Sequence, residues 1–367
     1  RPLGMPTVRD RVMQVIVKNT LEPEWESQFE PNSYGFRIGR SCQDAIAQCF
    51  NKLVNNPRGA RHTWVLDADI SGFFDNIAHE SILNMIGTHP SRELIKGWLK
   101  AGYVYQGIKT PTDKGTPQGG AIRPLLANIG LHGLEEVIEG IKLPKDKWGN
   151  RLKLGFIRYA DDFVVTSRER ENLDSALVQI KQWLSERGLE ISAEKTRIVH
   201  IQDGFNFLGF NLRQYKGRLL IKPQKEKVLK FCKELGKTIS ECATWTQQNL
   251  IGKLNPILRG FANYYKGVVS KKTFSYINHR VTMYLYRWAK RRHPNKGKRW
   301  VKNRYFHLIE GNDWTFARQG IDSRGRKRFY SLRSFALTEN SSYAAKATEE
   351  DNCSKINSFA TFKESSL

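Results

Sequence analysis

The stretch that most constrains this chain joins two apolar, β-prone runs at two adjacent aspartates, Asp161 and Asp162, within residues 156–165. Two such runs with so short a polar break predict a β-hairpin that carries both carboxylates at its tip. Adjacent strand residues point to opposite faces, so one aspartate must lie in the turn for the pair to converge. An ordinary Asp-containing turn gives the same local pattern, whereas a functional use of the tip is to hold Mg²⁺.

The net charge of the chain restricts its partners. Its 367 residues carry 60 Lys and Arg against 36 Asp and Glu, a formal net charge of +24. This excess predicts a polyanionic partner, either a nucleic acid or, as the competing interpretation, an anionic membrane surface. No run of about 18 apolar residues occurs, so we expect no membrane span. The five cysteines form no C-x-x-C pair, so we expect reduced thiols and a cytoplasmic location rather than zinc or disulfides.

A third carboxylate ends a predicted strand earlier in the chain. The apolar run before Asp69 predicts a strand, and residues 72–74 predict a turn into a helix. A carboxylate at the end of a buried strand is costly unless it binds a cation or caps a helix. Local sequence favours neither of these two uses of Asp69.

Three predicted loops carry groups that suit phosphate or nucleotide contacts. The loop around Arg37 mixes glycine, arginine and aromatic residues, which suits phosphate contacts or a solvated turn. The glycine-rich loop around Gln118 allows close backbone approach to a ligand and precedes a helix predicted over residues 125–138. Lys195 lies in a turn between two strands predicted within residues 189–199, where a lysine by itself is usually solvated.

The chain is predicted to divide into a mixed α/β part and a helical, basic part. The first helix should begin after the N-cap Thr7 and end before Pro23. The composition changes near Pro223, where we place a domain boundary. Three helices are predicted beyond it, at residues 228–240, 249–266 and 276–292.

Two segments of the helical part predict nucleic-acid contacts. The first, at residues 259–266, interleaves aromatic residues with hydrogen-bond donors, although its tyrosines also suit packing inside a helical bundle. The second has nine Lys or Arg and no acid between Arg287 and Arg304, which favours binding of phosphates. The residues expected to contact RNA or DNA are Arg37, Arg259, Tyr264, Tyr265, Lys266, Arg287, Arg291, Arg292, Lys298 and Arg299.

Seven short motifs follow one another in a specific order. They are Arg1-Pro2-Leu3-Gly4-Met5-Pro6-Thr7, Tyr34-Gly35-Phe36-Arg37, Asp69-Ile70 with Phe73-Phe74-Asp75, Gly115-Thr116-Pro117-Gln118-Gly119-Gly120, Tyr159-Ala160-Asp161-Asp162, Gly188-Leu189-Glu190 with Lys195-Thr196, and Leu208-Gly209-Phe210. This order resembles that of group II intron-encoded reverse transcriptase/maturases. The resemblance covers roughly residues 1–330 and includes the segment 254–265, which is similar to the maturase or thumb region.

The resemblance implies an α+β fold of the right-hand polymerase type. Fingers and palm are built from an antiparallel sheet with helices, and an α-helical thumb/maturase domain follows. The implied domains are partial fingers at 1–60, palm with fingers insertions at 61–222, the thumb/maturase domain at 223–293, a basic DNA-binding segment at 294–336 and a disordered tail at 337–367.

The resemblance also assigns roles to residues. Asp69, Asp161 and Asp162 match the family's catalytic carboxylates, which hold two Mg²⁺ ions. Lys195 matches a residue that donates a proton to pyrophosphate, and Phe74 matches a bulky gate that excludes a 2′-hydroxyl group. Arg1, Phe74, Gln118 and Tyr159 form the expected nucleotide-binding set.

Three departures from the family pattern stand out. Arg123 replaces a small hydroxyl residue, and we expect it to disturb the template-side loop or to add a phosphate contact. The tail lacks the Cys/His clusters of an endonuclease, so none is expected. The chain starts at a block that further fingers elements precede in the family, so an N-terminal fingers piece supplied in trans is a possible partner.

The resemblance therefore implies an RNA-directed DNA polymerase that extends a DNA primer on an RNA template with dNTPs and assists splicing of a group II intron. The expected partners are intron RNA and DNA, in a bacterial or organellar ribonucleoprotein. The alternative function is that of a maturase that binds intron RNA and has no independent polymerase activity.

Overall fold

The computed structural model describes residues 6–54, 62–105, 108–116, 119–144, 152–321 and 326–335. Arg1, Gln118 and the predicted disordered tail lie outside the described residues. The chain divides into two compact units. The N-terminal unit comprises the chain up to Leu208 together with Arg213–Leu219, and the helical unit comprises Gly209–Leu212 together with the chain from Leu220 onward.

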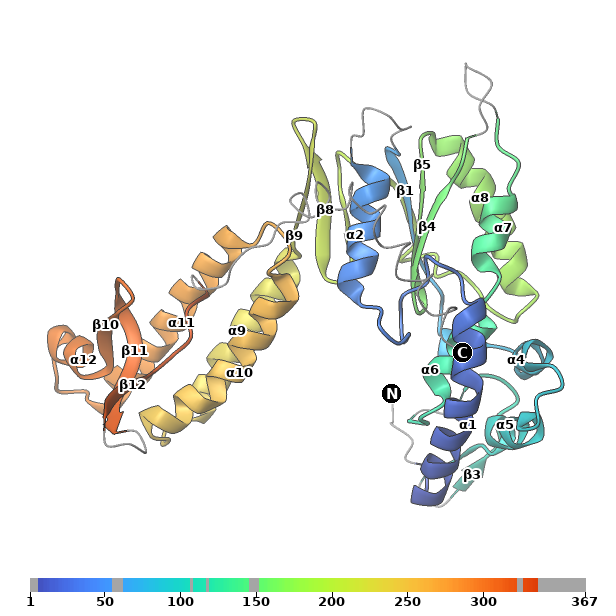
Figure 1. The fold of residues 1–367 in the computed structure, drawn as a ribbon. Helices are drawn as coiled ribbons and strands as arrows, with labels where there is room; N and C mark the ends of the chain where they lie inside the picture. The colour runs from blue at the N-terminus through green and yellow to red at the C-terminus, as the bar shows by residue number, and fades with distance from the viewer. Residues whose placement is uncertain are drawn as a thin grey trace, which may run out of the picture. The chain divides into compact units, whose positions relative to one another are not determined.

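A four-stranded antiparallel sheet with the order β4-β5-β1-β6 forms the centre of the N-terminal unit. Helix α2 packs on one face, while α8, with α7 against it, lies on the other (Figure 1). The elements named here are β1 (Trp64–Asp69), β4 (Gly155–Tyr159), β5 (Asp162–Ser167), β6 (Arg197–His200), α2 (Cys42–Leu53), α7 (Leu134–Gly140) and α8 (Arg170–Ser185).

The alternation of β1 separates the core from the predicted site. Leu66 and Ala68 are buried in the main hydrophobic core, where their cross-strand neighbours Val165 and Phe163 also lie. Asp69 falls on the opposite face because side chains alternate along a strand. The strand predicted to end at Asp69 is confirmed.

The other elements of the N-terminal unit surround this sheet and its core. They are α1 (Val8–Gln28), α3 (Phe73–Asn76), α4 (His79–Ile86), α5 (Arg92–Lys100), β2 (Tyr103–Tyr105), β3 (Ile108–Thr110) and α6 (Arg123–Gly130). A three-stranded sheet of β7 (Phe205–Phe207), β8 (Phe210–Tyr215) and β9 (Arg218–Pro223) contains the boundary between the units.

Two predicted helix boundaries are wrong. The N-cap Thr7 is confirmed, because its hydroxyl accepts the Asp10 N–H, but α1 continues through Pro23. Leu21 and Trp25 are both buried on its core-facing side, so packing outweighs the hydrogen bond that proline removes. The single helix predicted over 125–138 is two helices, α6 and α7, which break at Gly133 with φ of +94°.

Of the two strands predicted within residues 189–199, the structure contains only the second. This strand is β6, whereas the first half of the segment makes an isolated bridge between Ile191 and Ile70. The following turn therefore starts directly beside the end of β1.

The helical unit contains the three predicted helices, each longer than its apolar pattern suggested. They are α9 (Lys225–Glu241), α10 (Gln247–Tyr265) and α11 (Lys271–Arg292). The basic segment beyond them folds as α12 (Lys298–Tyr305) and a sheet of β10 (Phe306–Ile309), β11 (Asn312–Ile321) and β12 (Lys327–Ser331). Across the described part of the chain, none of the helices is long and apolar enough to span a membrane.

Candidate active site and nucleic-acid interface

The predicted hairpin is confirmed as β4 and β5. Their register pairs Tyr159 with Asp162, so that Ala160 and Asp161 are the two connecting residues. Ala160 has φ of +58°, the positive φ that a type II′ hairpin turn has at its first central position. Because Asp161 lies in the turn, it is released from the strand alternation that would separate it from Asp162.

The hairpin tip is braced by the backbone at Gly35. A Cβ atom at this position would lie 2.4 Å from the backbone nitrogen of Ala160, so a side chain does not fit without a shift of one backbone or the other. The carbonyl of Gly35 accepts a hydrogen bond of 2.8 Å from Nδ2 of Asn128. The loop before α2 is thus fixed against the tip.

The register of β1 with β5 brings the distant carboxylates together. Asp69 lies directly opposite Asp162, and directly opposed residues project from the same face. Nζ of Lys195 lies 2.6 Å from Oδ2 of Asp69. Its loop is held there because the Ser192 N–H donates to the Asp69 carbonyl at 2.8 Å.

The pKa values of this group reflect burial of the carboxyl groups and, after it, their crowded negative charge. Burial of the Asp162 carboxyl, its hydrogen bond with Asp69 and the charge of Asp161 raise the pKa of Asp162 to about 7. Burial also raises the pKa of Asp161. The hydrogen bond to Asp69 raises the pKa of Lys195, so the lysine is a firmly held cation beside the acids.

The donor chemistry of the aspartates fits Mg²⁺. They offer hard carboxylate oxygens. The charges of Asp161 and Asp69 contribute, after burial and a hydrogen bond with Asp69, to the raised pKa of Asp162, and a divalent cation would relieve this repulsion. Among the described residues, no group of three or more His, Cys, Asp or Glu side chains is close enough together to hold a metal ion. The Asp69 carboxylate is instead engaged by Lys195.

Sequence reasoning missed a second ion pair beside this group. Asp67 lies two residues before Asp69 on the same face of β1, and Nε of Arg197 is 3.3 Å from its Oδ2. Burial raises the pKa of Asp67, and the charge of Arg197 opposes this shift. The spacing of Asp67 and Asp69 in a predicted strand was the signal that could have identified it.

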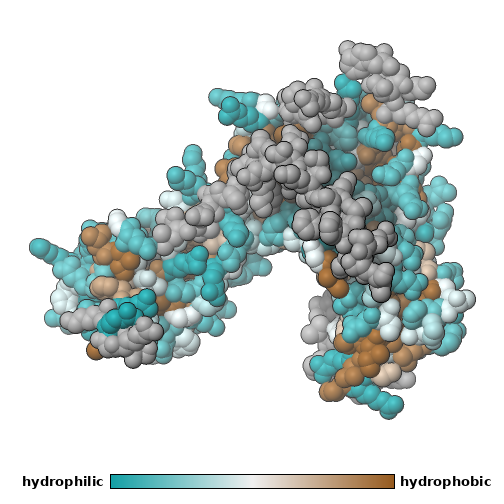
Figure 2. Space-filling view, viewed as in Figure 1, coloured by the Kyte–Doolittle hydropathy of each residue, from teal (hydrophilic) through white to brown (hydrophobic). Residues whose placement is uncertain are grey.

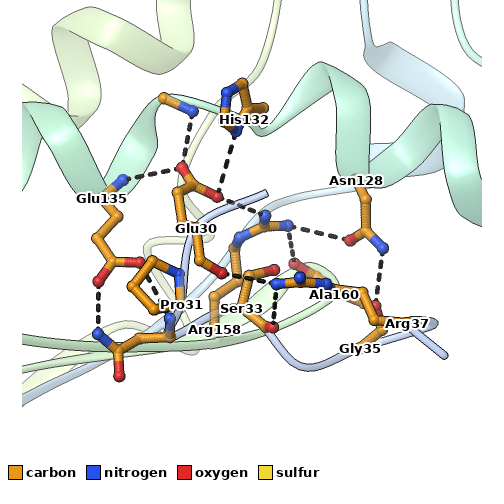
Figure 3. A network of polar contacts seen from close by, with 12 residues as sticks. Glu30, Pro31, Ser33, Gly35, Arg37, Asn128, His132, Glu135, Arg158 and Ala160 are labelled. Atoms are coloured by element: carbon orange, nitrogen blue, oxygen red, sulfur yellow. Dashed lines mark hydrogen bonds and ion pairs between the residues drawn. The ribbon is translucent and has the colours of Figure 1, made fainter. Parts of the chain in front are cut away.

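A buried polar network supports the hairpin from beneath (Figure 3). Arg158, the residue before Tyr159, is 0% exposed. Its guanidinium donates to Glu30 Oε2 at 3.2 Å, to Asn128 Oδ1 at 3.3 Å and to the Ala160 carbonyl at 3.5 Å. One arginine therefore joins the turn that carries Asp161 to α6 and to the segment that follows α1.

Glu30 is the acidic centre of the same network. Its carboxylate accepts the N–H groups of Gly133 at 2.7 Å and Glu135 at 3.3 Å, so it caps the N-terminus of α7. Burial would raise its pKa, but the neighbouring His132, whose Nδ1 lies 3.7 Å from Glu30 Oε2, and the charge of Arg158 outweigh burial and lower the pKa to about 2. This long-range cap satisfies N–H groups at the start of α7, directly after the turn at Gly133 that separates α7 from α6.

Arg37, which we expected to contact nucleic acid, belongs to the interior instead. It is 7% exposed, and its guanidinium binds the Glu26 carboxylate and the carbonyls of Glu30 and Ser33 at 2.6–3.1 Å. The expectation is therefore wrong, since these contacts leave the guanidinium no surface for a phosphate. A glycine-rich loop sequence does not reveal such burial.

The predicted gate, Phe74, lies in α3 immediately after β1. Its ring meets those of Phe73 and Phe36 at centroid distances of 5.1 and 6.4 Å. Its carbonyl accepts the Thr116 N–H at 2.7 Å, which joins α3 to the glycine-rich loop. Tyr159, the other described member of the nucleotide-binding set, is half-buried at the end of β4, and burial raises its pKa.

The residues predicted from segment 259–266 divide between packing and surface. Tyr265 is buried, and its hydroxyl donates to the Gly209 carbonyl at 3.0 Å, so its predicted role in stacking on bases is wrong. Tyr264 is half-buried and stacks on Phe210 at 5.2 Å. Arg259 and Lys266 are exposed.

A basic groove lies between α9 and α11. It has a volume of about 540 Å³, and Tyr276, Tyr284 and Trp288 contribute aromatic surface to it. None of the residues that line it is acidic. Its six cations are Lys233, Lys237, Arg280, Arg287, Arg291 and Arg292. We call this feature the α9–α11 groove.

Three of the predicted basic residues, Arg287, Arg291 and Arg292, line this groove. Arg287 and Arg291 are exposed and make no ion pair with another described residue. Arg292 is partly committed, because it donates to the carbonyls of Ala243 and Trp245 at 3.0 and 2.7 Å. Lys298 and Arg299 are exposed on α12. The side of the α9–α10 pair turned toward the viewer in Figure 2 is largely hydrophilic.

The sequence matches two protein-family models, which together cover the candidate active site and the groove of the helical unit. Residues 1–212 match the family described as "Reverse transcriptase (RNA-dependent DNA polymerase)". Residues 228–306 match the "Group II intron, maturase-specific domain". The first match covers the hairpin, β1 and the Lys195 loop, and the second covers the α9–α11 groove.

Individual relatives cover similar parts of the chain. "Protein YkfC" of Escherichia coli (strain K12) is 32% identical over 246 residues, which are 59% of this chain and 64% of the relative. "Group II intron-encoded protein LtrA" of Lactococcus lactis subsp. cremoris is 31% identical over 271 residues, 58% of this chain and 44% of the relative. A telomerase structure from Candida albicans has a TM-score of 0.41 and 13% identity, over 77% of this chain and 51% of that chain.

The carboxylate-bearing hairpin and the α+β fold around it define a protein of the reverse transcriptase class. With its maturase-specific domain, the chain belongs to the group II intron-encoded reverse transcriptase/maturases. It spans about 64% and 44% of the lengths of the two curated relatives named above.

Proposed function

We propose that this chain is an RNA-directed DNA polymerase that extends a DNA primer on an RNA template. The observation that carries the proposal is the register of β1 with β5, which sets Asp69 opposite Asp162 beside the turn residue Asp161. Family membership supports the reaction type, a nucleotidyl transfer from a dNTP.

The three aspartates are the candidate ligands of Mg²⁺. When bound, Mg²⁺ supplies activation of the primer 3′-hydroxyl and neutralises charge on the leaving pyrophosphate. The chain itself contributes the fixed spacing of the carboxylates, through the hairpin register and the Gly35 contact. Such fixed geometry lowers the cost of bringing the reacting groups together.

Lys195 and Phe74 serve the incoming nucleotide in this proposal. Lys195 is a protonated donor beside the acids, suited to giving a proton to the leaving pyrophosphate oxygen. The hydrogen bond to Asp69 is what raises its pKa, so any competition for the Asp69 carboxylate makes Lys195 a stronger acid. Phe74 forms the apolar wall beside the sugar.

We propose that the helical unit binds group II intron RNA through the α9–α11 groove. Six cations, three aromatic side chains and no acid among the lining residues match what a nucleic-acid backbone and exposed bases require. The match to the maturase-specific domain supports the intron as the source of that RNA. This groove also favours a second candidate function, an RNA-binding maturase without polymerase activity.

Primer extension on an RNA template with Mg²⁺ tests the polymerase and separates the two candidates. We expect Asp161→Asn and Asp162→Asn each to reduce extension by roughly a thousandfold or more, because each removes a charge that holds the metal. Asp174→Asn is the matched control and should extend normally, because it alters an exposed carboxylate on α8 whose ion pair among the described residues is with Arg170, at 3.9 Å.

The opposite result is equally informative. A wild-type chain that binds intron RNA tightly but extends no primer supports the maturase without polymerase activity. Extension that survives both substitutions in the hairpin would rule out these aspartates as the metal-binding carboxylates of the reaction.

A further inference from the structure

Arg123 occupies a position with an electrostatic cost. It is the first residue of α6, where the partial positive charge of the helix N-terminus disfavours a cation. We expected it to disturb the glycine-rich loop or to reach a phosphate. The described part of that loop is nevertheless docked, with the Gly115 N–H donating to the Ile77 carbonyl at 2.7 Å.

The guanidinium of Arg123 lies instead on the ring of Phe74. Its Cζ is 4.0 Å from the centre of the ring, a close cation–π contact. The guanidinium is also near enough to Asp161 for its charge to act on that carboxylate. Arg123 therefore contacts the candidate gate directly, and its charge acts on one of the candidate metal ligands.

Phe74 is restrained from three other directions. Phe73 and Phe36 meet its ring in edge-to-face geometry, at interplanar angles of 70° and 65°. The Thr116 N–H fixes its carbonyl at 2.7 Å. A planar guanidinium on the ring face completes this set and opposes the rotamer changes that would swing the ring aside.

We propose that Arg123 is a positioning residue that holds Phe74 as a fixed wall and so strengthens the selection of deoxynucleotides over ribonucleotides. The inference rests on the proposed polymerase function and on Phe74 as the wall beside the sugar. If the Phe74 ring can move aside, a nucleotide with a 2′-hydroxyl group binds with little steric penalty. If Arg123 holds the ring in place, the 2′-hydroxyl group clashes with it.

The test compares kcat/KM for a dNTP with that for the matching rNTP in primer extension. We expect Arg123→Ser to lower this ratio roughly threefold to tenfold, through loss of the cation–π contact. Arg123→Lys keeps the charge without the planar face and should fall between Arg123→Ser and the wild type. Thermal unfolding of each variant checks that the fold is retained.

A double-mutant cycle tests whether Arg123 acts on the dNTP-to-rNTP ratio through Phe74. Phe74→Ala should lower the ratio by more than Arg123→Ser does, and adding Arg123→Ser to Phe74→Ala should change it no further. An unchanged ratio in Arg123→Ser, or an equal drop in the Phe74→Ala background, overturns the inference while leaving the polymerase intact. A wild-type chain that extends no primer overturns the proposed function, and the inference with it.

Discussion

Two arginines of the N-terminal unit and two of the helical unit illustrate opposite uses of the same side chain. In the N-terminal unit, Arg37 and Arg158 are buried, and their guanidinium groups bind Glu26, Glu30 and backbone carbonyls. In the helical unit, Arg287 and Arg291 are exposed along a groove that no acid lines. The large positive charge of the chain therefore does not by itself locate the nucleic-acid surface, because buried arginines stabilise the fold and only exposed ones are available to phosphates.

The largest expected effect comes from removing a buried arginine. Arg158→Met should destabilise the chain by about 3–5 kcal/mol, because it leaves the Glu30 carboxylate buried without its cation. Arg291→Met, on the exposed helix face, should stay within about 0.5 kcal/mol of the wild type. Urea denaturation of the two variants measures this difference, and equal losses would erase the distinction between the two kinds of arginine.

The pH dependence of the free energy of unfolding tests the buried ion pair of Arg158 from the side of its partner, Glu30. The pKa of Glu30 is lowered from 4.5 to about 2, so its contribution is complete above about pH 4.5 and is lost as the pH falls toward 2. The loss should amount to about 3 kcal/mol. Glu30→Gln removes this titration, so its stability should vary less across that range. Parallel curves for the wild type and Glu30→Gln would contradict the proposed role of the carboxylate.

The smallest effect, on binding rather than folding, is expected from the exposed arginines. Arg287→Gln with Arg291→Gln should reduce the salt-dependence slope of RNA binding by about 0.7–0.9 per lost phosphate contact, with little change in stability. Lys181→Gln with Lys216→Gln removes the same charge from exposed positions of the N-terminal unit. If this control flattens the slope equally, the α9–α11 groove is not the RNA-binding surface.

Local sequence predicted features that depend on short-range physics. The hairpin of Asp161 and Asp162, the strand that ends at Asp69 and the N-cap Thr7 follow from β-propensity, alternation and capping, each of which acts within a few residues. The resemblance to a known family added the link between Asp69 and the hairpin, about ninety residues apart, which spacing alone could not supply.

What local sequence could not predict depends on contacts between distant residues. Pro23 stays inside a helix because Leu21 and Trp25 pack into the core. The start of α7 is capped by Glu30, about a hundred residues earlier. The burial of Arg37 and Tyr265 and the placement of Arg123 on Phe74 are likewise tertiary outcomes.

The contact between Gly35 and Ala160 gives the loop before α2 mechanical influence over the hairpin. Because backbone meets backbone there, no flexible side chain absorbs a displacement of the loop. Phe36, the next residue in the loop, touches the edge of Phe74. A displacement of this loop would therefore move the aspartate-bearing turn and the ring of Phe74 together.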